Sequence, residues 1–229
     1  LPSTLTSIGN QAFYDCRYIS GAINIPEGVT SIGGSTFSDC SSLSSITLPS
    51  TLSSFTGGSV FRGCTNLTSV YCEAVNPPYC SSELFSNEVT VYVYPQSIET
   101  YEAAWNSDYC TFESNGKTLD TTNTTTILYT TTDSNTIDMP NWVVKSNTYS
   151  NGVGTVVTYG KLTAIARDIF RNCTTLKSVV IPTGVTVIDS RAFSGCSSLT
   201  EVTIPDSVTS IGNSAFYKCS SLAEFNGKF

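Results

Sequence analysis

Hydrophobic positions recur along this chain at an interval of 23 or 24 residues. Each interval carries a phenylalanine and, three residues later, a cysteine. These pairs are Phe13 and Cys16, Phe37 and Cys40, Phe61 and Cys64, Phe170 and Cys173, Phe193 and Cys196, and Phe216 and Cys219. Such self-similarity is the signature of a repeat architecture, in which each repeat is one supersecondary unit. We therefore interpret these residues as the structural core of a stacked repeat.

The clearest repeat, residues 199–219, assigns a physical role to most of its positions. Val202 and Ile204 flank Thr203 in an alternating pattern, which predicts a short strand with the aliphatic side chains inside and the threonine outside. Gly212 is expected to permit the turn that follows. One repeat cannot hide its apolar face alone, but a stack of repeats with parallel strands about 4.8 Å apart does. The pattern therefore predicts a β-rich repeat solenoid.

The full pattern, Leu-x-x-Ile-x-Ile-Pro-x-x-Val-x-x-Ile-Gly-x-x-Ala-Phe-x-x-Cys, resembles the BspA-like leucine-rich repeats of bacterial and protist surface proteins. The resemblance covers residues 1–112 and 153–229. Thr36 and Val60 replace the alanine before phenylalanine, and Phe55 replaces the isoleucine before glycine, but these changes are compatible in size with a core position. The resemblance implies a right-handed leucine-rich-repeat superhelix with a parallel sheet on one face and a short 3-10 or irregular convex side.

The regular spacing breaks after Leu67, and residues 68–112 are predicted to be atypical coils that cap a first array, residues 1–112. The alternation in residues 89–94 predicts a strand, and residues 97–105 predict a short amphipathic helix. Aromatic side chains gather in this cap, and we interpret them as covering an open coil end in preference to stacking against sugars. They are Tyr71, Tyr79, Tyr92, Tyr94 and Trp105.

Residues 113–229 are predicted to form a second part of the chain. A linker and a small β-rich N-terminal cap, residues 113–160, precede a second repeat array, residues 161–229. Residues 113–126 are interpreted as a polar linker because they hold a turn signal and a run rich in threonine. The expected elements of the cap are strands at residues 127–130, 141–144 and 155–159, and a turn at Asn151 and Gly152.

Composition and charge narrow the possible partners. Charged residues make up 13% of the chain, and the net charge is −7 with 11 lysines and arginines. This balance argues against a nucleic-acid partner, which needs clustered cations, and against anionic membranes. No segment is long and apolar enough to span a bilayer. Both ends fall inside repeats, so we interpret the chain as a piece of a longer protein. Its high content of serine and threonine favours an extracellular protein, and the family resemblance implies a location that is extracellular or on the bacterial cell surface.

The chain contains no histidine, which excludes Ser-His-Asp and Cys-His nucleophile arrangements and histidine-containing zinc sites. Paired carboxylates could serve glycosidase chemistry, but the spacing of the acids near the cap is not diagnostic, and solvated acids are the simpler interpretation. These acids are Glu73, Glu83, Glu88, Glu99 and Glu102. We therefore expect no catalytic residue, no metal site and no cofactor.

Nine cysteines raise the question of disulfides. Six occupy the repeat position, where in-register side chains point in parallel, so a buried cysteine ladder is the favoured interpretation. Cys72, Cys80 and Cys110 fall outside this ladder. A bridge between two of these three is a hypothesis that rests on their clustering in the cap.

The outward strand positions form the candidate binding surface, because a solenoid presents them as one continuous face. They are Asn24, Ser45, Thr47, Ser69 and Tyr71 in the first array, and Ser178, Val180, Glu201, Thr203 and Asn226 in the second. For any single residue, a merely solvated position is the simpler interpretation. Together, their hydroxyl and amide groups suit hydrogen bonding to a protein or a glycan.

Mainly because of the family resemblance, we favour a cell-surface or secreted binding module whose partner is an extracellular protein or glycan. The resemblance adds adhesion to host proteins and other cells as an implication, since a fold alone does not establish a function. The alternative is a passive spacer that displays other domains. A glycan-processing enzyme is a third and less favoured hypothesis.

Overall fold

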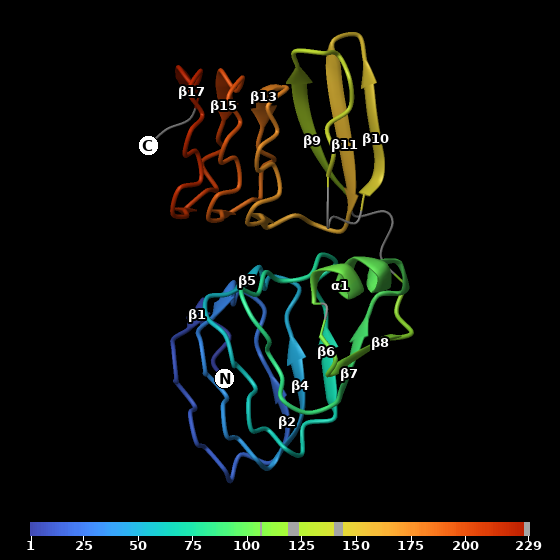
Figure 1. The fold of residues 1–229 in the computed structure, drawn as a ribbon, viewed down its shortest axis with the longest axis vertical. Helices are drawn as coiled ribbons and strands as arrows, with labels where there is room; N and C mark the ends of the chain where they lie inside the picture. Colours follow the sequence, from blue (N-terminus) through green and yellow to red (C-terminus); the bar gives the residue numbers. More distant parts are fainter. Residues whose placement is uncertain (106, 119–123, 140–143, 227–229) are drawn as a thin grey trace. The chain divides into compact units, whose positions relative to one another are not determined.

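A computed structural model describes residues 1–105, 107–118, 124–139 and 144–226. The chain divides into two compact units, Leu1–Thr118 and Leu119–Phe229, and each is described by itself (Figure 1). The first unit extends past residue 112, where sequence reasoning ended the first array, because the strand β8 (Cys110–Ser114) pairs in register with the strand before it.

The first unit contains two parallel sheets, each built from one short strand per coil. The larger sheet has the order β2-β4-β6-β7-β8, so its strands follow the chain (Figure 1). Its first four strands are β2 (Gly21–Asn24), β4 (Leu43–Leu48), β6 (Ser69–Cys72) and β7 (Val89–Val93). The smaller sheet consists of β1 (Ser7–Ile8), β3 (Ser31–Ile32) and β5 (Ser54–Phe55). Both sheets are parallel because each coil returns the chain to the same side before the next strand begins.

A ladder of phenylalanine rings fills the interior between these sheets. Phe37 stacks between Phe13 and Phe61, with ring centroids 5.2 and 5.8 Å away. Phe85 adds a further rung 5.4 Å beyond Phe61, although it lies in the coils that the sequence marks as atypical. The cysteines follow the same register, since the thiol of Cys64 donates a hydrogen bond to the carbonyl of Phe37 in the preceding coil. The cysteine ladder is therefore both packed and hydrogen-bonded.

The repeat glycine has a different role from the one expected. A Cβ atom on Gly212 would lie 2.4 Å from the backbone nitrogen of Ser190, and one on Gly33 would lie 2.3 Å from that of Asn10. The left-handed conformation belongs instead to the position two residues later, such as Ser214 with φ 58°. The expectation that Gly212 permits a turn was wrong, because this glycine allows adjacent coils to approach closely.

The helix α1 (Ile98–Ala104) follows a 3-10 turn, η1 (Pro95–Ser97), and covers the end of the first core. Tyr101 and Trp105 are buried, and their polar atoms donate hydrogen bonds to the carbonyls of Ala74 and Pro78, both 2.8 Å long. The rings of Phe55 and Trp105 meet edge to face at 5.8 Å. The predicted amphipathic helix and the predicted burial of Trp105 are confirmed.

The second unit contains one mixed sheet and one small parallel sheet. The mixed sheet has the order β10-β11-β9-β13-β15-β17, in which the first three strands and the β9-β13 pair are antiparallel. Its strands are β9 (Thr124–Thr131), β10 (Val144–Ser150), β11 (Val153–Tyr159), β13 (Leu176–Val180), β15 (Glu201–Thr203) and β17 (Glu224–Asn226). The small sheet is built from β12 (Ala164–Ile165), β14 (Val187–Ile188) and β16 (Ser210–Ile211).

The hairpin of β10 and β11 turns at Asn151 and Gly152, as the sequence predicts. Both residues have positive φ angles, 51° and 81°, which is the conformation that a two-residue hairpin of matching twist requires. The predicted strand at residues 127–130 lies within β9. Of the strand predicted at 141–144, only Val144 lies in the described residues, where it begins β10. Residues 113, 114 and 124–126, expected in a linker, belong to strands.

The second core repeats the ladder of the first. Phe193 stacks between Phe170 and Phe216 at 4.9 and 5.2 Å, with the rings nearly parallel. The thiols of Cys196 and Cys219 donate to the carbonyls of Phe170 and Phe193. The sides opposite the large sheets consist of hydrogen-bonded turns and two-residue strands. Within the described residues η1 is the one 3-10 helix, so the irregular option of the predicted convex side is the one observed.

Replacing Phe37 with alanine is expected to lower the free energy of unfolding by about 3–5 kcal/mol, because it empties a fully buried rung that touches two others. Urea denaturation followed by circular dichroism measures this change. Tyr18→Ala is the matched control, since that side chain is 97% exposed and its loss should change stability by less than about 0.5 kcal/mol. Equal effects of the two substitutions would contradict the role of the ladder.

Candidate functional site

The outer side of the larger first-unit sheet, here called the first face, carries two rows of side chains in register. One row runs through Asn24, Thr47, Tyr71, Tyr92 and Glu113. The other runs through Ala22, Ser45, Ser69, Thr90 and Thr111. The side chains between the rows, such as Ile46 and Val70, are fully buried. The five first-array residues predicted to face outward therefore lie on one surface.

A pair of tyrosines stands out on the first face. The rings of Tyr71 and Tyr92 stack with centroids 4.9 Å apart and an interplanar angle of 14°, which matches the strand spacing beneath them. Tyr71 is 39% exposed. One side of its ring is covered by Tyr92, and along the row the next residue is the small Thr47. The tyrosine pair therefore presents an amphipathic aromatic edge beside a strip of hydroxyl groups.

Sequence reasoning missed Tyr92 as a face residue and grouped it with Trp105 as a cover for the coil end. The structure separates the two, because Trp105 is buried against α1 and Phe55 whereas Tyr92 lies on the sheet. The alternation of β7 was the available signal, since Tyr92 falls between the buried Val91 and Val93.

A charged contact borders the first face. The ammonium group of Lys117 pairs with the carboxylate of Glu73, and Tyr94 lies close to both groups. The pKa of the Tyr94 hydroxyl is raised, first by burial and then by the negative charge of Glu73. Tyr94 thus remains protonated and neutral in the physiological range.

The outer side of the mixed sheet in the second unit, here called the second face, holds the other predicted residues. Val180, Thr203 and Asn226 form one row. Ser178, Glu201 and Glu224 form the next. These residues belong to a different sheet from the first-face residues. The positions predicted to face outward are therefore divided between two sheets.

An apolar pair lies on the second face. Val180 is the register partner of Leu128 on the antiparallel strand β9, and each side chain is 42% exposed. Leu128 was missed because it is not part of the repeat and reaches the face only through the pairing of β9 with β13. The amide of Asn226 donates to the carboxylate of Glu201, so part of this face is engaged in its own hydrogen bonds.

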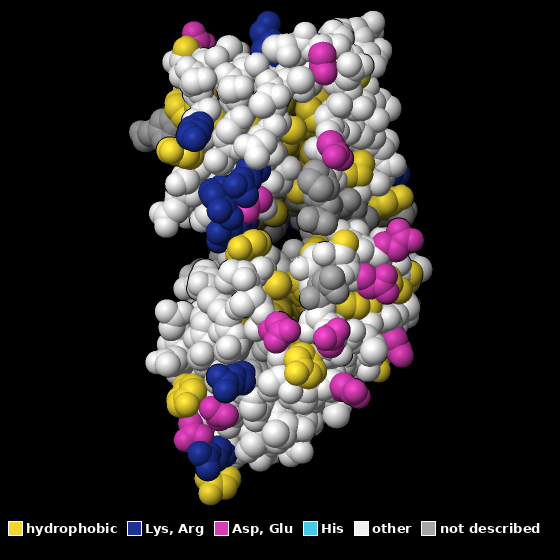
Figure 2. Space-filling model, in the orientation of Figure 1, with side chains coloured by type: hydrophobic (Ala, Val, Ile, Leu, Met, Phe, Trp, Pro, Cys, Tyr) yellow, Lys and Arg dark blue, Asp and Glu magenta, His cyan; other side chains and the backbone are white. Residues whose placement is uncertain are grey.

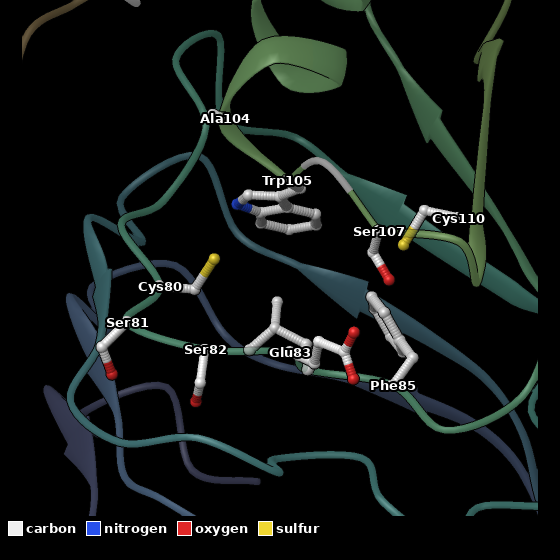
Figure 3. A pocket seen from close by; sticks show the side chains of 10 residues that line it. Cys80, Ser81, Ser82, Glu83, Phe85, Ala104, Trp105, Ser107 and Cys110 are labelled. Atoms are coloured by element: carbon white, nitrogen blue, oxygen red, sulfur yellow. The ribbon is translucent and has the colours of Figure 1, made fainter.

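A cavity of about 310 Å³ opens in the cap of the first unit (Figure 3). Its walls include the side chains of Phe85 and Trp105, the carboxylate of Glu83, and the thiols of Cys80 and Cys110. Figure 3 shows the two cysteines on either side of the Trp105 ring. The hydrogen bond from the indole nitrogen to Pro78 holds this ring in place.

All nine cysteines are free thiols, so the hypothesis of a bridge among Cys72, Cys80 and Cys110 is not borne out. Burial raises the pKa of Cys72 to about 12 and the pKa values of Cys80 and Cys110 to about 11. These thiols stay protonated near neutral pH and are poor nucleophiles there. Within the described residues no group of three or more acidic, cysteine or histidine side chains is placed to hold a metal ion.

Iodoacetamide is expected to modify Cys80 and Cys110 slowly at pH 8, because only about one thiol in a thousand is ionised three units below its pKa. The rate should rise about tenfold per pH unit toward pH 11. Peptide mass spectrometry after timed alkylation measures both sites. Cys72, which is 1% exposed, serves as the unreactive internal control. Sites that react only after reduction of the denatured chain would reveal a disulfide and contradict the free thiols.

The fold and the two faces define a class of protein, the leucine-rich-repeat solenoids, in which short in-register strands form a parallel sheet. The BspA type leucine rich repeat region matches residues 1–105 and 143–228 in 6 copies. The chain therefore belongs to the BspA-type leucine-rich-repeat family, and the predicted fold class is confirmed.

Two solved structures are similar to this chain. A leucine-rich repeat protein from Bacteroides ovatus ATCC 8483 shares 23% identity over 98% of this chain and 41% of its own, with a TM-score of 0.30. A protein from Faecalibacterium prausnitzii A2-165, described as a leucine rich cell surface protein, shares 17% identity over 100% of this chain and 71% of its own, with a TM-score of 0.29. This chain thus spans less than half of the Bacteroides protein. A search of curated proteins finds no match. No helix within the described ranges is long and apolar enough to cross a membrane.

Proposed function

We propose that this chain is a binding module of a cell-surface or secreted protein, which uses the first face to hold an extracellular protein or glycan. The tyrosine pair carries the proposal: two stacked rings, one of them 39% exposed, stand on a rigid parallel sheet. Tyrosine is enriched at the energetic centres of interfaces because its ring is apolar and its hydroxyl forms hydrogen bonds.

The surroundings of the tyrosine pair support a binding role. Thr47, Ser45 and Ser69 are half-buried, so their hydroxyls are accessible but their backbones are fixed by the sheet. A partner that binds there meets donors and acceptors whose positions are already ordered, which reduces the entropic cost of association. The face contains no charged residue before Glu113 in its row, which suits a neutral or weakly polar partner surface.

The cell-surface location in this proposal is supported by family membership and by the low charge and high hydroxyl content of the chain. An enzymatic role has little support, since the two thiols that share the cap cavity with Glu83 stay protonated near neutral pH and are poor nucleophiles there. The competing function is a passive spacer, which requires the first face to be only a solvated surface.

The double variant Thr47→Glu/Tyr71→Glu is expected to weaken binding at least about tenfold, because it removes the exposed aromatic anchor and adds two charges to the face. The measurement is a solid-phase binding assay of the chain against extracellular-matrix proteins, fibrinogen and mucin glycans. Saturable binding to one of these, lost in the variant, is the expected result.

The matched control is Tyr18→Glu/Thr65→Glu, which makes the same chemical changes at exposed turn positions of the first unit. Circular dichroism and thermal unfolding verify that both variants are folded. Equal binding by the wild type and both variants would remove the first face as the contact surface, and absence of binding across the panel would favour the spacer.

A further inference from the structure

Positive charge is concentrated in one place on the second unit. The chain has five arginines, and three of them, Arg167, Arg171 and Arg191, fall within 25 consecutive residues. Figure 2 shows such a gathering of basic side chains with an acidic one on the second unit, in a protein whose net charge is −7. This arginine cluster lies on the turns that follow β12 and β14 and is separate from both sheet faces.

The arginine cluster converges on a single carboxylate. Arg191 donates a hydrogen bond of 2.7 Å from Nη2 to Oδ2 of Asp168. The Nε atoms of Arg167 and Arg171 lie 3.5 and 3.7 Å from the same carboxylate. Asp168 thus brings one negative charge to three guanidinium groups. By contrast, Arg17 in the first unit pairs one to one with Asp15.

The repeat geometry explains why these side chains meet. Asp168, Arg191 and Ser214 occupy the same repeat position in successive coils, each with φ near the left-handed value, 59°, 57° and 58°. The corresponding position of the first unit holds the neutral residues Gln11, Ser35 and Ser59. The charged column is therefore a particular feature of the second unit and is not required by the turn.

A second acid lies beside the arginine cluster. Asp189 takes the position that glycine occupies in Gly212 of the next coil, directly after the paired isoleucines Ile188 and Ile211. Burial raises the pKa of Asp189, and the positive charge of Arg167 only partly offsets this effect. Asp189 thus adds a second carboxylate beside the three guanidinium groups, so within the described residues one positive charge remains in excess. In addition, the Nε atom of Arg191 lies out of solvent with no hydrogen-bond acceptor among the described residues.

We propose that Arg167, Arg171 and Arg191 form a binding site for a tetrahedral oxyanion of the sulfate or phosphate type. Guanidinium groups offer forked donors that match such oxygens, and three of them approaching from two coils suit a tetrahedral group better than a two-oxygen carboxylate. A bound anion would neutralise the positive charge that Asp168 and Asp189 leave in excess. The same chemistry could be supplied by a free ion or by a sulfate ester on a glycan.

The site does not imply nucleic-acid binding. Proteins that bind nucleic acids contact about six to ten phosphates, whereas this cluster contains three arginines. The expectation of no nucleic-acid partner stays a prediction, although its premise of unclustered cations does not hold at this place.

The test is an isothermal titration of the full chain with sodium sulfate, sodium phosphate and galactose 6-sulfate at constant ionic strength adjusted with sodium chloride. Saturable binding of one anion per chain is expected. Arg171→Ala should weaken it at least about tenfold, since a charge-assisted contact is removed. That side chain is 48% exposed, and its one ion pair within the described ranges is the 3.7 Å contact with Asp168, so the variant should fold normally.

Arg62→Ala is the matched control, because Arg62 follows Phe61 as Arg171 follows Phe170 and is exposed in the first unit. It should leave anion binding unchanged. Arg191→Lys keeps the charge but removes the forked donor, and it should also weaken binding. Tighter binding of galactose 6-sulfate than of inorganic sulfate would identify a sulfated glycan as the source, and equal binding would identify the free ion. Heats no larger than those of chloride, or equal binding by Arg171→Ala and Arg62→Ala, would overturn the proposal.

Discussion

The stacking of one coil directly upon the next is the constraint on which both units depend. Parallel backbone hydrogen bonds hold each strand in register with its neighbour. Each residue therefore lies next to the residues that occupy the same repeat position in the two adjacent coils. This is why Phe37 meets Phe13 and Phe61 ring to ring, and why the thiol of Cys64 reaches the carbonyl of Phe37. At Gly33 and Gly212 a glycine is required, since any side chain there would collide with the backbone of the preceding coil.

The same register organises the surface. Tyr71 and Tyr92 stack because they occupy equal outward positions on adjacent strands, and Arg191 reaches Asp168 because they occupy equal turn positions on adjacent coils. Side chains on a solenoid therefore act in columns. Two residues at equal positions on adjacent coils therefore make a contact that neither residue makes alone. The tyrosine pair and the arginine cluster are both of this kind.

Much of this was available from the sequence, because the 23- or 24-residue period fixes which positions are inside. The ladder residues, the strand alternation and the covering role of Trp105 follow from that period and from helical spacing. The fourth rung at Phe85 was obscured by its irregular flanks. Leu128 could not be placed, since the antiparallel pairing of β9 with β13 is a tertiary contact with no counterpart in the repeat. The close approach at Gly212 likewise depends on the contact between two coils, so the sequence of one repeat does not indicate it.

The departures from the repeat are therefore where a specific function is expected to be encoded. Side chains at core positions must pack against the coils above and below, so their identity is determined mainly by packing. The turn position that holds Ser35 in the first unit holds Arg191 in the second. Because it accepts either a neutral or a charged residue, core packing does not determine its identity. Asp189 is more informative still, because it places a half-buried carboxyl at a position where another coil has glycine, and this burial carries a desolvation cost. That cost is offset in part by the backbone amide of Ser190, which donates a hydrogen bond to the carboxylate, and by the positive charge of Arg167, so electrostatic contacts stabilise the carboxylate at this position.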